Sequence, residues 1–140
     1  MPTYFRCKIL FDEDGADETL NAEHVGADRY RLENIPFFAL GVSRYDVVEA
    51  REDTAGMLTF VRVVEKSGHR TVRCVADESR TEATHRDLVH ELATRGLRCE
   101  AILDKYFTID VPPSVGLDTI VEFLITRGWR WEHADPPPPP

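Results

Sequence analysis

The chain has 140 residues, of which 42% are hydrophobic and 30% charged, and its formal net charge is −8. This balance is typical of a folded protein of one domain or two small lobes, and it excludes a disordered chain. The acidic charge and the absence of a lysine- and arginine-rich run argue against a nucleic-acid partner, because phosphate contacts are usually made by a basic surface.

The N-terminal residues MPTYFRCKILFDEDG include no long apolar segment, and the apolar runs of the chain are too short to cross a bilayer. We therefore expect a soluble protein with no secretory signal and no membrane partner. The three cysteines, Cys7, Cys74 and Cys99, contain no closely spaced pair. That spacing is typical of reduced thiols, so we expect a cytoplasmic location.

The first half of the sequence is predicted to be rich in strands. The acidic segment 12–18 is expected to be a loop or turn, and Pro36 ends a short strand. Lys66-Ser67-Gly68 is expected to be a tight turn inside a hairpin over 57–76. Together the segments predict a small curled sheet or partial barrel. The predicted strands cover residues 4–11, 30–35, 45–51, 58–65 and 69–76.

The second half contains an internal repeat. Residues 92–100 (LATRGLRCE) recur as residues 124–132 (LITRGWRWE), with six of nine positions identical at an offset of 32. Each copy predicts an amphipathic helix that stops at Arg-Gly and is followed by a short strand. Gly96 and Gly128 occupy the position at which a helix commonly ends in a left-handed residue.

The repeat and its flanking strands predict a β-α-β-β-α-β order, which is the ferredoxin-like arrangement. The predicted elements are strand 70–76, helix 84–95, strands 97–103 and 105–111, helix 115–127 and strand 129–133. We therefore predict an α+β fold. Its parts are a β-rich, barrel-like half over 1–68, a ferredoxin-like half over 69–134 and a polyproline tail over 135–140.

Alternation along these strands assigns two faces to the second sheet. The residues expected to face the helices are Val72, Cys74, Leu97, Cys99, Phe107, Ile109, Val111, Trp129 and Trp131. The residues expected on the other face are Arg73, Arg98, Glu100, Tyr106, Thr108, Asp110, Arg130 and Glu132. A single apolar face is typical of an antiparallel sheet that is covered on one side. The polar face either binds a polar peptide, packs on the first half or faces water.

The sequence contains no recognisable catalytic, metal or cofactor motif. His90-Glu91 begins a zinc-binding H-E-x-x-H pattern but lacks its second histidine, and no close cysteine pair supplies thiolates. Phosphate-binding glycine loops are also missing, so we expect no metal and no cofactor. An active site that is assembled only in three dimensions remains an alternative, with His69, Cys99 or Asp46 as candidates.

Two short segments and the polar sheet face are candidates for binding. The segment 34–38 (NIPFF) contains Asn34 and puts Phe37 and Phe38 beside a proline, so that at least one phenylalanine points away from the inside of a simple strand. This pair is either an exposed apolar anchor or a plug for one end of the barrel. His69 is either a placed polar group or an ordinary turn residue. On the sheet face, the candidate binding residues are Arg73, Arg98, Tyr106 and Arg130.

Three segments, YRLENIPFFALGVSRYDVVEA, VVEKSGHRTVR and TIDVPP, resemble domain-of-unknown-function family 4265, a family of small bacterial cytosolic proteins. The resemblance runs from Tyr4 to about Glu132 and excludes the polyproline tail. It implies a bacterial cytosolic protein and transfers no activity. It also marks family-like positions, which are Asn34, Pro36, Phe37, Phe38, Gly68 and His69.

These observations predict a non-enzymatic protein that binds a peptide or protein partner. Examples are an accessory protein that holds a peptide for a modifying enzyme, and an inhibitor of a toxin. Strand addition at an exposed sheet edge is a natural way for such a fold to bind a peptide. The alternatives are a small enzyme and a small-molecule sensor, and the sensor predicts a homodimer with its ligand at the sheet edge.

Overall fold

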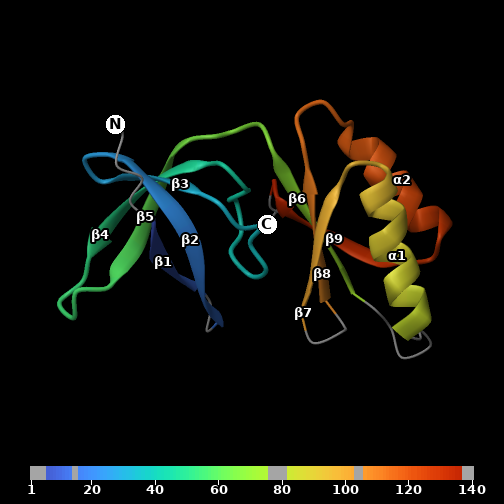
Figure 1. Ribbon diagram of the computed structural model, residues 1–140, viewed down its shortest axis with the longest axis horizontal. Coiled ribbons are helices and arrows are strands. Elements are labelled where there is room, and N and C mark those ends of the chain that lie inside the picture. The colour runs from blue at the N-terminus through green and yellow to red at the C-terminus, as the bar shows by residue number, and fades with distance from the viewer. Residues whose placement is uncertain (1–5, 14–15, 76–81, 103–105, 137–140) are drawn as a thin grey trace.

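The computed structural model shows a β-barrel joined to a sheet that carries two helices (Figure 1). The turn expected near Leu103 and the greater part of the proline tail lie outside the residues that the structure describes. Neither helix of the described part is long and apolar enough to cross a membrane. The described residues are 6–13, 16–75, 82–102 and 106–136.

The strands of the first half close into a barrel, so the predicted curled sheet is a complete ring. Neighbouring strands are antiparallel, and the ring closes through a parallel contact in which Leu10 lies beside Thr59. Apolar side chains from alternate positions fill the interior, among them Ile9, Phe11 and Leu20. The strands are β1 (Arg6–Glu13), β2 (Ala16–Gly26), β3 (Arg29–Leu32), β4 (Val47–Glu52) and β5 (Leu58–Glu65).

The prediction of a loop over 12–18 is wrong. β1 continues to Glu13, β2 begins at Ala16, and Phe11 pairs with Glu18 across the two strands. Acidic residues are poor strand formers on average. Pairing with a neighbouring strand and burial of the apolar face outweigh that preference, because strand propensity depends strongly on context.

The predicted hairpin over 57–76 is also wrong. β5 pairs with β4 and β1, whereas β6 (Arg70–Val75) pairs with two strands of the second sheet. Closure of the barrel occupies both edges of β5, so β6 must pair elsewhere, and residues 66–69 carry the chain between the two sheets. Gly68 has φ +92°, and a Cβ there would lie 3.0 Å from Cγ of Pro113, so this crossing favours glycine.

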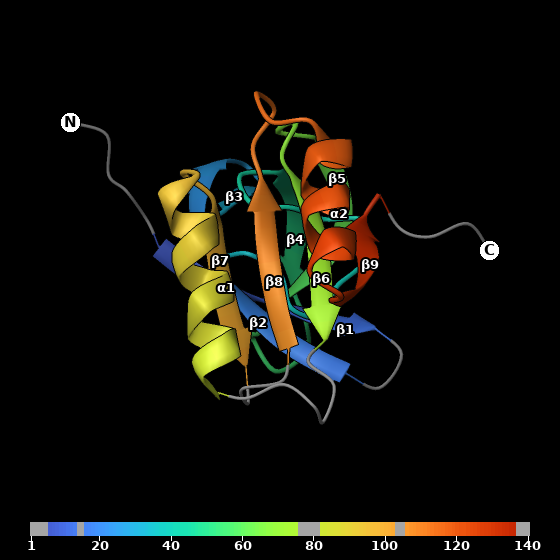
Figure 2. The ribbon, with the colours of Figure 1, turned by 90° about the vertical axis from the view of Figure 1, so that its right-hand side faces the viewer.

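The second sheet has the strand order β7-β8-β6-β9, with antiparallel neighbours. Both helices cover one face of the sheet, and the barrel lies beyond the other face (Figure 2). The chain therefore forms an α+β fold of a closed barrel, a second sheet and two helices. The remaining elements are α1 (Glu82–Thr94), β7 (Arg98–Ile102), β8 (Tyr106–Val111), α2 (Leu117–Thr126) and β9 (Arg130–Asp135).

Both helices end as the internal repeat predicts. Gly96 and Gly128 have φ values of 75° and 72°. The N–H that follows each glycine donates to the carbonyl of Leu92 or Leu124 at 3.0 Å, which is the long bond of a glycine-terminated helix. The predicted glycine stops are therefore confirmed. α1 begins two residues before the predicted start at Thr84.

The predicted face assignment of the second sheet is confirmed. The side chains that face the helices form one buried cluster, and both tryptophans belong to that side, with Trp129 only 5% exposed. The helices bury this face because it is almost entirely apolar, which leaves the polar face toward the barrel. The cluster includes Val72, Cys74, Leu88, Leu92, Leu97, Phe107, Ile109, Val111, Ile120, Phe123, Leu124 and Trp129.

Candidate functional site

The polar face of the second sheet carries three rows of side chains that run across β8, β6 and β9. Strand register defines these rows, because residues paired across antiparallel strands lie side by side. The outer row is Tyr106, Val75 and Arg130; the middle row is Thr108, Arg73 and Glu132; the inner row is Asp110, Thr71 and Asp135.

A loop from the barrel covers the middle and inner rows. This connecting loop, residues 33–46, joins β3 to β4 and lies between the barrel and the second sheet (Figure 1). Arg73 Nη1 donates to the Phe37 carbonyl at 2.9 Å, and Thr108 Oγ1 donates to the Pro36 carbonyl at 2.9 Å. Ser43 of the loop bonds to Thr71 and Asp135 of the inner row. Over the inner row and over Thr108 and Arg73 of the middle row, the polar face therefore packs on the first half of the chain, whereas Glu132 is exposed.

Glu18 of β2 holds the same loop from the barrel side. Its Oε2 accepts the N–H of Phe37 at 3.0 Å, and its Oε1 accepts the N–H groups of Phe38 at 3.0 Å and Ala39 at 2.7 Å. Bonds from backbone N–H groups to a carboxylate are stronger than neutral ones. The backbone of the loop is thus held by the barrel through its N–H groups and by the second sheet through its carbonyl groups.

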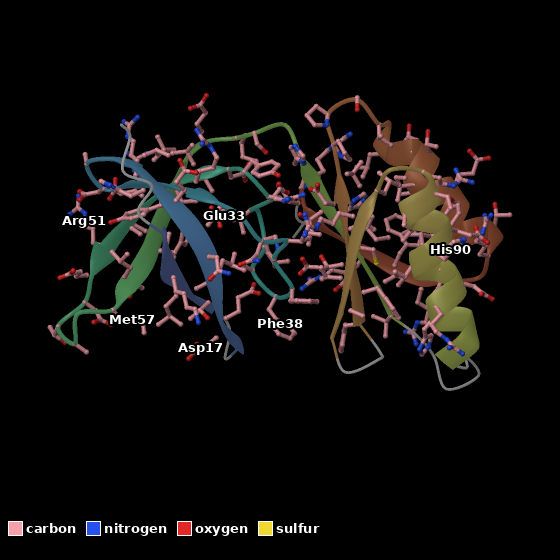
Figure 3. All side chains as sticks on the ribbon, viewed as in Figure 1. Asp17, Glu33, Phe38, Arg51, Met57 and His90 are labelled. Carbon is pink, nitrogen blue, oxygen red and sulfur yellow. The ribbon has the colours of Figure 1, made fainter. Side chains whose placement is uncertain are left out.

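The predicted NIPFF residues have different environments within this loop. Asn34 Oδ1 accepts the Asn21 N–H at 2.6 Å, so this side chain fixes the loop to β2. Phe37 is half-buried, whereas Phe38 is 36% exposed and Leu40 is 37% exposed. Figure 3 shows the Phe38 side chain projecting from the bend of the loop between the two halves. Phe38 is therefore the more exposed phenylalanine of the pair.

Two of the three outer-row residues are exposed. Tyr106 is 41% exposed, Arg130 is exposed, and both line a pocket of about 280 Å³ whose wall also includes Val75, Trp131 and Glu132. Arg73 connects this pocket to the connecting loop, because its Nη2 lies 3.0 Å from Glu132 Oε1 while its Nη1 binds loop carbonyls.

Lys66 lies beside the inner row, at the centre of a charged cluster that includes Asp135 of that row. Its Nζ lies 2.6 Å from Asp46 Oδ2 and 2.5 Å from Asp135 Oδ2, and Ser43 Oγ donates to Asp135 Oδ2 at 2.5 Å. Burial by itself lowers the pKa of Lys66, but the bonds to Asp135 and Asp46 outweigh it and raise the pKa above its ordinary value. Because these residues come from both halves, the cluster ties the barrel to the second sheet.

His69, a predicted site residue, pairs with Asp110 in the same region. His69 Nδ1 lies 3.0 Å from both carboxylate oxygens of Asp110, which is 3% exposed. Burial raises the pKa of Asp110, and His69, Arg44 and Arg98 oppose that rise only in part. Tyr45 lies edge-on to the imidazole at 5.1 Å and has φ 70°, a strained value for a bulky residue. A histidine oriented by a carboxylate has the geometry of a general base.

The structure does not bring Cys99 to the other candidates for an enzyme. Asp46 and His69 lie at the junction of the halves, whereas Cys99 packs against the core under the helices. Burial, followed by the nearby charge of Glu100, raises the pKa of Cys99 to about 12, so its thiol stays protonated and is a poor nucleophile. In the described part of the chain, no group of three His, Cys, Asp or Glu side chains is arranged to hold a metal.

The register thus brings four predicted residues toward one end of the polar face: Phe38 through its loop, and Arg73, Tyr106 and Arg130 on the strands. Arg98 pairs with Asp110 at the opposite end, near His69.

Sequence reasoning missed Glu18, Ser43 and Lys66, because their partners lie far away in the chain and no local pattern marks them. Asp110 offered a signal. It is a carboxylate between apolar residues of a strand, and a buried carboxylate must find a partner.

Comparison with known proteins agrees with the fold and adds a family. A structure described as the novel crystal structure of a hypothetical protein from Neisseria gonorrhoeae superposes with a TM-score of 0.73 and 20% identity, covering 99% of this chain and 100% of that chain. At this identity the similarity establishes the fold alone. No curated protein matches the sequence significantly. The model of the family described as a domain of unknown function (DUF4265) matches residues 18–132. The chain therefore belongs to the DUF4265 family.

Proposed function

We propose that the protein binds a peptide or protein partner at the outer row of the polar sheet face, with Phe38 as the apolar anchor. The observation that carries this proposal is the contrast between the backbone and the side chains of the connecting loop. Glu18, Arg73 and Thr108 hold the backbone around Phe38 on both sides, yet the Phe38 side chain stays 36% exposed. Large exposed aromatic residues on a rigid support are typical centres of binding energy.

A held loop favours binding because little conformational entropy is lost when a partner docks. Leu40 of the same loop and Tyr106 of the outer row add exposed apolar surface, since they are 37% and 41% exposed. The pocket of about 280 Å³ accepts one apolar side chain, and Arg130 at its wall offers a positive charge to an acidic group of a peptide.

Strand addition along β9 is the binding mode that fits this surface best. In the described part of the chain, β9 pairs with β6 on one side and with no strand on the other. A peptide that extends the sheet there gains main-chain hydrogen bonds. Alternate side chains of such a peptide point to the same face. One of them therefore points toward the pocket of the outer row.

The proposal is tested with peptides selected from a displayed random library on the purified protein. Binding of a selected peptide is measured by fluorescence anisotropy, and Trp131 provides a second, intrinsic signal. We expect Phe38→Ala to weaken binding about tenfold or more, because removal of a central aromatic anchor typically costs more than about 1 kcal/mol.

Val61→Ala on β5 is the matched control, since Val61 is an apolar side chain that is 49% exposed but belongs to the barrel. It should leave the affinity unchanged. Thermal unfolding of both variants checks that they remain folded. Wild-type affinity in a folded Phe38→Ala variant contradicts the proposal.

We also propose that residues 69–134 form a ferredoxin-like half and residues 1–68 a separate barrel half. The chain order β6-α1-β7-β8-α2-β9 and the antiparallel strand order β7-β8-β6-β9 support this classification of the second half. The passage of the chain from one sheet to the other between Glu65 and Arg70 supports the boundary.

A further inference from the structure

A second pocket lies on the opposite side of the second sheet, between α1 and the strands β7 and β8. Its volume is about 440 Å³, which is in the range of small-molecule sites. Most of its wall is apolar and comes from Val89 and Ala93 of α1, Ala101 of β7 and Phe107 of β8. In Figure 2, α1 lies in front of β7 and β8, and the barrel lies behind the sheet.

Among the described residues, the polar ones that line this pocket are His85, Arg86 and His90, all on α1. No acidic side chain that the structure describes lines the pocket, although the chain carries a net charge of −8. Figure 3 labels His90 on this helix. Asp87 follows Arg86 in the chain but does not line the pocket. Arg86 is exposed and lines the pocket, so a ligand there can reach its charge.

His85 adds hydrogen-bonding capacity that the protein does not use. Both of its ring nitrogens are buried and have no hydrogen-bond partner among the described residues. The ring packs against Phe107 and Trp129, with centroids 5.3 Å and 6.0 Å away. Buried polar atoms in folded proteins nearly always have a partner, so an unpartnered imidazole at a pocket wall points to a missing polar group.

We propose that this pocket binds a small apolar molecule that carries one anionic group, such as an aromatic or short-chain acyl carboxylate. The apolar walls hold the hydrocarbon part, and the exposed Arg86 and His90 receive the anion at the rim. An arginine beside a carboxylate gives a charge-assisted hydrogen bond, which sets the orientation of the ligand. This site is independent of the proposed peptide surface, because the sheet separates the two.

Two dyes that share the same rings test the proposal. 1-Anilinonaphthalene-8-sulfonate carries an anionic sulfonate, and N-phenyl-1-naphthylamine lacks it. Both fluoresce strongly when they leave water for an apolar site, so their affinities for the full chain are measured by titration. We expect Arg86→Gln to weaken binding of the sulfonate about five- to tenfold and binding of the neutral dye less than twofold.

Ala93→Phe and Ala101→Phe fill the pocket from the helix and from the strand, and each should weaken both dyes about tenfold or more. Both alanines are exposed, and a thermal melt of each variant identifies any that fails to fold. Arg130→Gln, which removes the same charge from the opposite face, is the matched control for Arg86→Gln and should change neither affinity.

Phe38→Ala separates this proposal from the proposed peptide function, because it should leave both dye affinities unchanged whether or not it affects a peptide. The proposal is overturned if Arg86→Gln alters both dyes equally or neither. Undiminished dye binding in both folded pocket-filling variants overturns it as well.

Discussion

The covered and uncovered parts of one sheet face use similar residues in different ways. In the inner and middle rows, Arg73, Asp110 and Asp135 are largely buried. Arg73 donates to a carbonyl of the connecting loop, Asp110 lies beside His69 and Arg44, and Asp135 pairs with Lys66. In the outer row, by contrast, Tyr106 and Arg130 are exposed and line a pocket.

This contrast shows that a polar strand pattern does not by itself mark a binding surface. Where a neighbouring loop supplies carbonyl and N–H groups of the right geometry, polar side chains hold two halves of a protein together. Where the loop ends, side chains of the same pattern are exposed. The exposed Phe38 stands at the border between the two regions.

Among the substitutions in the covered region, we expect Lys66→Met to lower the free energy of unfolding most. The substitution leaves Asp46 and Asp135 buried without their cation, at side-chain exposures of 0% and 8%. We expect a loss of about 2–3 kcal/mol in the free energy of unfolding, at the lower end for a buried pair because the Lys66 side chain is 44% exposed. Denaturant titration measures the loss.

Arg62→Met is the control for this prediction, since it breaks an exposed ion pair with Glu49 and should cost no more than about 0.5 kcal/mol. The raised pKa of Lys66 also sets a pH signature. Its stabilisation is present below pH 10.5 and is lost as pH rises through the folded-state pKa, so the difference between wild type and Lys66→Met shrinks there. Equal losses in both variants would refute a special role for Lys66.

Glu18→Ala tests whether the loop backbone determines the position of Phe38. It removes the acceptor of three backbone N–H groups, so we expect a loss of about 2 kcal/mol in the free energy of unfolding. Peptide affinity should fall as well, although Phe38 is intact. Glu18→Gln keeps one acceptor oxygen and should recover about half of the stability. If Glu18→Ala binds peptide normally, the held backbone is irrelevant to the anchor.

Asp110→Asn is the mildest change to the covered region and should alter stability by less than about 1 kcal/mol at pH 7, because the amide oxygen still accepts from His69. The folded-state pKa of Asp110 is raised above 3.8. The folded state therefore takes up this proton first, and wild type gains stability relative to Asp110→Asn as pH falls through that pKa toward 3.8. Unfolding curves across this pH range measure the difference in stability between wild type and Asp110→Asn. A difference that does not change with pH contradicts the prediction, because it means that His69 and Arg44 cancel the effect of burial on the pKa of Asp110.

Sequence periodicity predicted which residues share the polar face, but not that the connecting loop packs on part of that face. A period of two placed Arg73, Tyr106 and Arg130 on one face, and the register confirms that they share it. It gave no sign that Thr108 and Arg73 would bind carbonyls of the connecting loop, because those bonds join residues more than thirty positions apart. The missed strand β2 had a local signal: only Asp14 and Gly15 separate it from β1, and Asp-Gly favours a two-residue hairpin.

The sequence by itself determined the elements whose physics is local. The helical stripes, the glycine stops at Gly96 and Gly128 and the two faces of the second sheet follow from side-chain period and backbone conformation. Only the tertiary structure decided that β5 and β6 belong to different sheets and that Lys66 meets Asp135, 69 positions away. Such contacts depend on which edges and charges remain unsatisfied once the barrel has closed, and no local pattern records that.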